Sequence, residues 1–316
     1  MPLEVRKTDK LLNIFGDLHG KQRNNKLEIE VAFALDPQIE GMAAAFYMDG
    51  SASMNNSGSY GRSGGLFGLG RQKNSVGEAM RISVPYVAGK DANGMCRVVY
   101  WATGDKGQGI EVIGEMTGEQ AQTAEFDGPK EFGGGTYLLP AVRDFVAYIQ
   151  QVSRDGQPAR AALGVIVTDG QFHDFDDVRD YTRKMLVPAI ADGKFPRTVF
   201  TVVGVGKDVD AEQMEELMHE ATPESYKGRP IWCYALADHV SQLPELVSHL
   251  IEANTPAFWG GAVFTDPNGA IVQTFEDMVP AVVKFALPLN ARSFNLRVGK
   301  DTYTQTLQVV EADHEE

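Results

Sequence analysis

Cysteine is scarce in this sequence, since only Cys96 and Cys233 occur among its 316 residues. Both lie in apolar, strand-like segments, so we interpret them as thiols buried in a hydrophobic core rather than as a disulfide or a metal site. No apolar run approaches the roughly 18–20 residues that a membrane-spanning helix needs. The N-terminal segment MPLEVRKTDK has no apolar stretch followed by a small-residue cleavage site, so no secretory signal is expected. These absences predict a cytoplasmic protein without membrane insertion.

Basic residues are in the minority, with 29 Lys and Arg against 43 Asp and Glu and a formal net charge of -14. Proteins that bind nucleic acids or anionic membranes present basic patches, so neither class of partner is expected. The phosphate-cradling pattern G-x-x-x-x-G-K-[ST] does not occur, which argues against a nucleotide loop. An acidic protein partner remains compatible with this charge, because a bound divalent cation bridges two sets of carboxylates.

The middle of the chain alternates apolar, strand-like runs with segments of helical periodicity. The predicted strands are residues 42–48, 96–102, 161–167, 197–205 and 231–236, and the predicted helices are residues 137–152, 175–191, 211–220 and 240–252. Runs without polar alternation indicate strands that are buried on both faces. The alternation predicts an α/β fold, in which a doubly wound, mostly parallel sheet carries helices on both faces.

The two ends of the chain have a different pattern. Residues 26–33, KLEIEVAF, alternate strictly between apolar and polar, as in a half-buried strand. After Pro256 the sequence is β-rich, with turn sequences at Asp266-Pro267-Asn268-Gly269 and Gly299-Lys300-Asp301. We expect both ends to form a small all-β appendage. The predicted organisation is an N-terminal segment (1–39), an α/β domain (40–255) with a mobile Gly/Ser-rich insertion (55–77), and a C-terminal β-rich segment (256–316).

Three loops of this α/β domain carry hard oxygen donors. The strand at 42–48 ends in Asp49-Gly50-Ser51-Ala52-Ser53, Thr136 follows three glycines at the start of a helix, and Asp169 ends the strand at 161–167. The carboxyl ends of parallel strands share one edge of the sheet, where ligands bind. We therefore expect two carboxylates and three hydroxyls to converge on a Mg²⁺ site with one position left open, with Mn²⁺ or Ca²⁺ as alternatives.

This set of motifs resembles the metal-ion-dependent adhesion site of von Willebrand factor A domains, over roughly residues 40 to 255. The order D-G-S-A-S, G-G-T, T-D-G matches that family, and the spacing is similar to its copine-like and bacterial tellurium-resistance-associated branches. The resemblance implies that Ser51, Ser53 and Thr136 ligate the ion directly. It implies that Asp49 and Asp169 act directly or through water. Ala52 is a departure, because many relatives have glycine there.

The resemblance implies a metal-dependent protein-interaction module rather than an enzyme. A partner's Asp or Glu would enter the open coordination position, in a bacterial stress-response or other multiprotein complex. Two alternatives remain open: a Mg²⁺-dependent phosphatase or hydrolase, and an adaptor to an AAA+ ATPase with a structural metal. The phosphatase alternative rests on Gly16-Asp17-Leu18-His19-Gly20, which resembles the first metal-binding motif of calcineurin-type metallophosphatases and is expected to be a loop before a strand. His173 is interpreted as a surface loop residue, and Asp174, Asp176 and Asp177 as caps of a helix or as charges near the ion.

Overall fold

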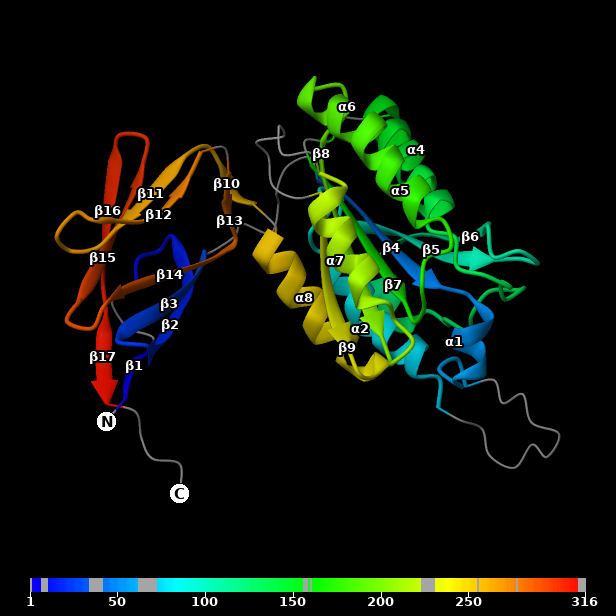
Figure 1. The fold of residues 1–316 in the computed structure, drawn as a ribbon, viewed down its shortest axis with the longest axis horizontal. Helices are drawn as coiled ribbons and strands as arrows, with labels where there is room; N and C mark the ends of the chain where they lie inside the picture. Colours follow the sequence, from blue (N-terminus) through cyan, green and yellow to red (C-terminus); the bar gives the residue numbers. More distant parts are fainter. Residues whose placement is uncertain are drawn as a thin grey trace. The chain divides into compact units, whose positions relative to one another are not determined.

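The computed structural model describes residues 2–6, 11–33, 42–61, 73–155, 159, 161–222, 231–254, 256–276 and 278–311. The chain divides into two compact units (Figure 1). One unit is Pro37–Leu250, and the other combines Met1–Asp36 with Ile251–Glu316. The predicted insertion 55–77 includes residues 62–72, which lie outside the described residues.

The unit Pro37–Leu250 is built on a six-stranded sheet of order β6-β5-β4-β7-β8-β9. Its strands are β4 (Met42–Asp49), β5 (Met95–Thr103), β6 (Gly109–Thr117), β7 (Ala161–Thr168), β8 (Arg197–Val205) and β9 (Trp232–Ala237). Neighbouring strands are parallel from β5 through β9, whereas β6 runs antiparallel to β5 at one edge. Every residue of β4 and of β7 is buried. Apart from Asp49 and Thr168 at their C-terminal ends, these two strands carry mainly apolar side chains, because both of their faces are covered.

Helices cover the two faces of this sheet (Figure 1). The helical segments are α1 (Ala52–Asn56), α2 (Ser75–Ala88), α3 (Gly118–Thr123), α4 (Leu139–Asp155), α5 (Phe175–Tyr181), the π-helical η1 (Thr182–Leu186), α6 (Val187–Ala191), α7 (Ala211–Glu220), η2 (Val240–Gln242) and α8 (Leu243–Asn254). On one face, α4 and α7 pack through Phe145 and Leu217 into a core that contains Tyr47, Phe200 and Trp232. Helix α2 contacts β4, β5, α3 and η2. β4 and β7 are parallel neighbours, so the loops that follow them lie at the same edge of the sheet.

The second unit consists of β-strands. A five-stranded sheet has the order β14-β3-β2-β1-β17, a four-stranded sheet the order β12-β11-β15-β16, and β10 pairs with β13. The strands are β1 (Leu3–Arg6), β2 (Phe15–Arg23), β3 (Lys26–Phe33), β10 (Pro256–Trp259), β11 (Ala262–Thr265), β12 (Ile271–Phe275), β13 (Met278–Pro280), β14 (Val282–Pro288), β15 (Ser293–Val298), β16 (Asp301–Thr306) and β17 (Gln308–Glu311). Its core contains five aromatic rings in mutual contact: Phe15, Phe33, Phe264, Phe285 and Phe294.

The predicted fold class, a doubly wound α/β chain with a small all-β appendage, is wrong for this chain. The sheets of five, four and two strands are antiparallel throughout, and the six-stranded sheet also has an antiparallel edge. The ends of the chain pair with each other, β1 with β17 and β3 with β14. They enclose a hydrophobic core of their own, so they form a full β-rich unit rather than an appendage.

No helix in the described ranges is both long enough and apolar enough to cross a membrane.

Candidate functional site

The candidate site lies where β4 ends in the unit Pro37–Leu250. Asp49 is the last residue of β4 and is completely buried. Its Oδ1 accepts the backbone N–H of Ser51 at 2.7 Å, and its Oδ2 accepts the Thr168 hydroxyl at 2.7 Å. Burial raises the pKa of Asp49, while the hydrogen bonds from Ser51 and Thr168 oppose that rise. The Asp49 carboxylate is therefore held in one orientation by its own loop, through Ser51, and by the neighbouring strand β7, through Thr168.

Two serines connect the β4 loop with the β7 loop. Ser51 precedes α1 with extended backbone, and its hydroxyl lies 2.9 Å from that of Ser53. The Ser53 hydroxyl donates to Asp169 Oδ1 at 2.7 Å. The structure thus joins four of the five predicted site residues, Asp49, Ser51, Ser53 and Asp169, in one hydrogen-bonded cluster.

Asp169 is the second carboxylate of this cluster, and its surroundings disfavour its ionisation. Its pKa is raised to about 7, first by burial and then by the negative charges of Asp49 and Asp208, while the hydrogen bond from Ser53 opposes the rise. Two carboxylates that share a small volume of low dielectric disfavour each other's ionisation. A proton or a cation at this position relieves their repulsion.

Thr136 reaches the same edge of the sheet on a glycine loop. Gly133 donates its N–H to the Gly50 carbonyl at 2.9 Å and accepts the N–H of Ala52 at 2.8 Å. A Cβ on Gly133 would lie 1.9 Å from the Ala102 carbonyl oxygen, so only glycine fits there. A Cβ on Gly170 would lie 3.8 Å from Thr136 Oγ1, which places the buried Thr136 beside the β7 loop.

Two residues of this site, Thr168 and His173, were not recognised as such in the sequence. Thr168, at the end of β7, is buried and donates to Asp49. His173 is exposed, yet its Nδ1 accepts the N–H of Thr136 at 2.9 Å and its own N–H donates to the Thr136 carbonyl at 2.9 Å. The interpretation of His173 as an ordinary surface residue therefore missed its contact with the site. The available signal was the presence of His173 and Asp174 in the short loop that follows Asp169.

Asp174 caps a helix other than the one that it precedes. Its two carboxylate oxygens accept the N–H groups of Leu138 and Leu139 at 2.8 Å each, at the start of α4. It makes no side-chain capping bond to α5. Asp176 pairs instead with Arg179 at 2.6 Å on the surface of α5. Asp174 consequently ties the loop after β7 to the helix that follows Thr136.

The donor set is poor in conventional metal ligands. The described part of the chain holds no group of three or more His, Cys, Asp or Glu side chains placed to hold a metal. The cluster at the end of β4 offers two carboxylates, and its other oxygens belong to hydroxyl groups. Hydroxyl and carboxylate oxygens suit a hard cation such as Mg²⁺, and the set does not suit zinc.

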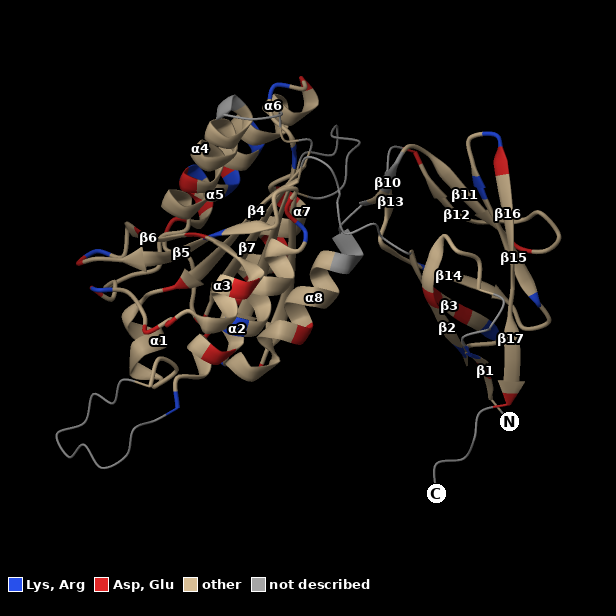
Figure 2. Ribbon diagram, turned by 180° about the vertical axis from the view of Figure 1, so that it is seen from behind, with Lys and Arg blue, Asp and Glu red and all other residues tan. Residues whose placement is uncertain are grey.

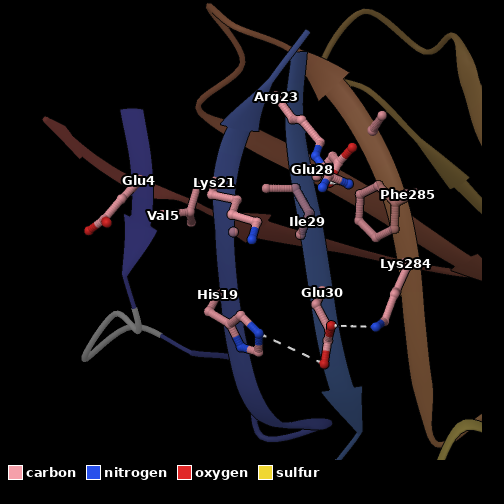
Figure 3. A pocket seen from close by; sticks show the side chains of 12 residues that line it. Glu4, Val5, His19, Lys21, Arg23, Glu28, Ile29, Glu30, Lys284 and Phe285 are labelled. Atoms are coloured by element: carbon pink, nitrogen blue, oxygen red, sulfur yellow. Dashed lines mark ion pairs between the residues drawn. The ribbon is translucent and has the colours of Figure 1, made fainter. Parts of the chain in front are cut away.

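A separate hollow of about 790 Å³ lies on the five-stranded sheet of the β-rich unit (Figure 3). Its charged side chains come from neighbouring strands of this sheet, where His19 and Lys21 of β2 lie opposite Glu30 and Glu28 of β3 (Figure 3). Figure 2 shows acidic residues on β3. Glu30 pairs with Lys284 at 2.9 Å and with His19 at 3.8 Å, and Arg23 pairs with Glu28 at 3.7 Å. Mutual pairing of this kind is typical of the solvated face of a sheet.

The segment Gly16-Asp17-Leu18-His19-Gly20 belongs to this sheet. It was expected to be a loop before a strand, but it lies within β2. Leu18 is buried, whereas Asp17 and His19 are on the solvated face. Asp17 and His19 are therefore residues of the β-rich unit, and the candidate site lies in the other unit.

Comparison with known proteins gives no family assignment. No family model matches the sequence, and no curated protein matches it. Two crystal structures of the pilus adhesin SpaC from Lactobacillus rhamnosus GG are similar in 96% and 97% of this chain and 47% of that protein, at 11% identity and TM-scores of 0.43 and 0.44. Proximal thread matrix protein 1 from the mussel byssus is similar over 81% of this chain and 51% of that protein, at 14% identity and a TM-score of 0.40. The chain spans about half the length of these structures.

These findings correct the assignment to von Willebrand factor A domains. No model of that family, and no other family model, matches the sequence. The placement in copine-like or tellurium-resistance branches, the stress-response setting and the label of a metal-ion-dependent adhesion site depend on that assignment and are withdrawn with it. What remains is the geometry of Asp49, Ser51, Ser53, Thr136 and Asp169.

Proposed function

We propose that the chain binds a divalent cation, Mg²⁺ or Mn²⁺, through Asp49, Ser51, Ser53, Thr136 and Asp169. Through this cation it binds a carboxylate of a protein partner. The observation that carries the proposal is the pair of carboxylates, Asp49 and Asp169, that the loops after β4 and β7 bring into one hydrogen-bonded cluster with Ser51 and Ser53. The negative charge of Asp49 raises the pKa of Asp169, and the Ser53 hydroxyl donates a hydrogen bond to Asp169 Oδ1 at 2.7 Å. A hard divalent cation neutralises this pair and accepts the neighbouring hydroxyl oxygens as ligands.

A partner carboxylate is the ligand that best completes such a site. Mg²⁺ and Mn²⁺ favour six oxygen ligands, and Mg²⁺ in proteins keeps several positions for water or for an incoming oxygen. Ser53 is exposed and Asp169 is partly exposed, whereas Asp49, Ser51 and Thr136 are buried. The cation would therefore be approached from the side of Ser53 and Asp169. An Asp or Glu side chain would there replace one water on the cation.

Titration calorimetry with Mn²⁺ tests the cation site directly. The wild-type chain is expected to bind one Mn²⁺, and Asp49→Ala with Asp169→Ala is expected to weaken binding by at least about 100-fold, because even outer-shell changes weaken metal affinity by roughly 10–100-fold. Ser53→Ala is a milder variant, since it removes an exposed hydroxyl without touching the core. The matched control is Asp180→Ala with Asp192→Ala, two exposed carboxylates of the same unit that pair with Lys184 and Lys194.

The carboxylate ligand is tested on the Mn²⁺-loaded chain by water proton relaxation. Adding acetate, and then a peptide with one Glu, is expected to lower the relaxation enhancement as water leaves the ion. Mn²⁺ binding that survives in the double variant would refute the cation site. Unchanged relaxation would refute the carboxylate ligand.

Two other results would favour the alternative functions. Partner capture that is insensitive to a chelator would favour an adaptor with a structural cation. Turnover of a phosphoester with Mn²⁺ would favour a hydrolase.

A further inference from the structure

We infer that His173 is a positioning residue of the cation site, which it serves by holding Thr136 in place. The inference rests on the proposed function and adds to it a residue that contributes no ligand. Of the proposed ligands, Thr136 is the one whose backbone is held least by a strand or helix. It follows Gly133, Gly134 and Gly135, and α4 begins only at Leu139. Glycine backbones sample many conformations, so this segment needs external restraints to keep a hydroxyl on a metal ion.

The restraints come from the loop that also carries Asp169. His173 and Thr136 exchange two hydrogen bonds, with the Thr136 N–H donating to His173 Nδ1 and the His173 N–H donating to the Thr136 carbonyl, both at 2.9 Å. Asp174 then binds the N–H groups of Leu138 and Leu139. Four hydrogen bonds thus fasten residues 136–139 to residues 173–174. The loops that supply Thr136 and Asp169 are consequently fixed to each other.

The imidazole is held from two sides. Its Nδ1 accepts the Thr136 N–H at 2.9 Å and lies 3.4 Å from the Thr136 carbonyl oxygen. The ring stacks on Tyr137, with centroids 5.4 Å apart and an interplanar angle of 24°. Ring orientation is thereby restrained by the residue next to Thr136. A misplacement of Thr136 by a fraction of an ångström would lower cation affinity, because ligands must be held to about 0.5 Å of their productive geometry.

The exposure of His173 allows positioning to be separated from folding. Its side chain contributes little to the core, so its removal is expected to change cation affinity much more than thermal stability. His173→Ala is expected to weaken Mn²⁺ binding by roughly 10–100-fold, the range for residues that orient metal ligands. His173→Asn is expected to restore affinity to within about threefold, because Asn Oδ1 takes nearly the place of imidazole Nδ1 and accepts the same N–H.

The experiment combines Mn²⁺ calorimetry on the full chain with hydrogen exchange at the Thr136 amide. In the wild type and in His173→Asn the amide is expected to be protected, and in His173→Ala it is expected to exchange faster, with or without metal. His219→Ala is the control, because His219 is an exposed histidine in the last turn of α7. Unchanged Mn²⁺ affinity in His173→Ala overturns the inference while leaving the cation site standing.

Two other outcomes also overturn it. Equal losses in His173→Ala and His173→Asn, with a lowered melting temperature in both, would mean that His173 acts in folding. A wild-type chain that binds no Mn²⁺ would remove the proposed function together with the inference. Amide exchange at Thr136 would in that case still show whether the two loops are fastened to each other.

Discussion

The negative charges around Asp169 are the main electrostatic feature of the candidate site. The carboxylate lies beside a second, fully buried carboxylate, and the neighbouring charges that act on it, Asp49 and Asp208, are negative. The hydrogen bond from Ser53 lowers the pKa of Asp169 but does not return it to its ordinary value. Such a pair of carboxylates lowers the free energy of unfolding of a protein that already has an excess of acidic residues. A cation bound between Asp49 and Asp169 would remove this destabilisation, and the free energy gained would contribute to the affinity for the cation.

The pH dependence of stability tests this reading of Asp169. Its pKa rises from 3.8 in the unfolded chain to about 7 in the folded one, so the folded state binds more protons between these values. The free energy of unfolding should therefore fall as pH rises from about 4 to 7. In EDTA at pH 8, Asp169→Asn should be more stable than the wild type by about 1–2 kcal/mol, a value discounted for partial exposure.

Urea unfolding of a Trp259→Phe chain from pH 4 to 8 provides the measurement. The remaining tryptophans, Trp101 and Trp232, are both buried in the unit Pro37–Leu250. Without Mn²⁺, Asp169→Asn should be more stable than the chain with Asp169. Saturating Mn²⁺ at pH 8 should reverse this order of stability, because the cation stabilises only the chain that has the carboxylate. Identical pH slopes with and without Asp169 would contradict the shifted pKa.

Single elements were predictable where burial dictates composition. The strands expected at residues 42–48, 161–167 and 197–205 are confirmed as β4, β7 and β8, because strands covered on both faces must be apolar throughout. The helix expected at 211–220 is confirmed as α7, and the side chain of Asp210 caps its N-terminus. The partner of a polar side chain was not predictable in the same way. Asp174 precedes α5 but caps α4, since the choice between two helix starts depends on how the loops fold.

Removing this cap should destabilise α4 locally. Asp174→Ala leaves the Leu138 and Leu139 N–H groups without their acceptor and is expected to cost about 0.5–2 kcal/mol, as for other helix caps. Asp174→Asn keeps one acceptor oxygen and should cost less. Urea unfolding of the Trp259→Phe chain measures both. The control is Asp176→Ala, whose exposed ion pair with Arg179 is worth at most about 1 kcal/mol. A cost for Asp174→Ala no larger than for Asp176→Ala would argue against the cap.

The whole molecule depends on contacts that local patterns do not contain. β1 pairs with β17 and β3 with β14, across almost the full length of the chain. Each strand taken alone is compatible with several partners, so the sequence suggested an appendage where the structure has a unit with its own aromatic core. The segment Phe15–Arg23 was misjudged for a related reason. Its polar residues resemble a loop motif, yet the segment pairs with β3, and an irregularity between Phe15 and Asp17 lets both Phe15 and Leu18 be buried.

The division into two units makes a last prediction about cation binding. All five proposed ligands lie in Pro37–Leu250, so a cation should stabilise that unit and leave the β-rich unit unchanged. At a concentration 100 times the dissociation constant, ligand binding adds about 2.7 kcal/mol. For a unit of this size the gain corresponds to roughly 5–10 °C in melting temperature.

Calorimetry of the full chain should show that one unfolding transition moves to higher temperature with Mn²⁺ while another stays in place. The fluorescence of Trp101 and Trp232 in the Trp259→Phe chain should follow the transition that moves. In Asp169→Ala neither transition should move. A shift of both transitions in the wild type would mean that the cation acts on the β-rich unit as well, and the site would then have to include residues beyond the three loops.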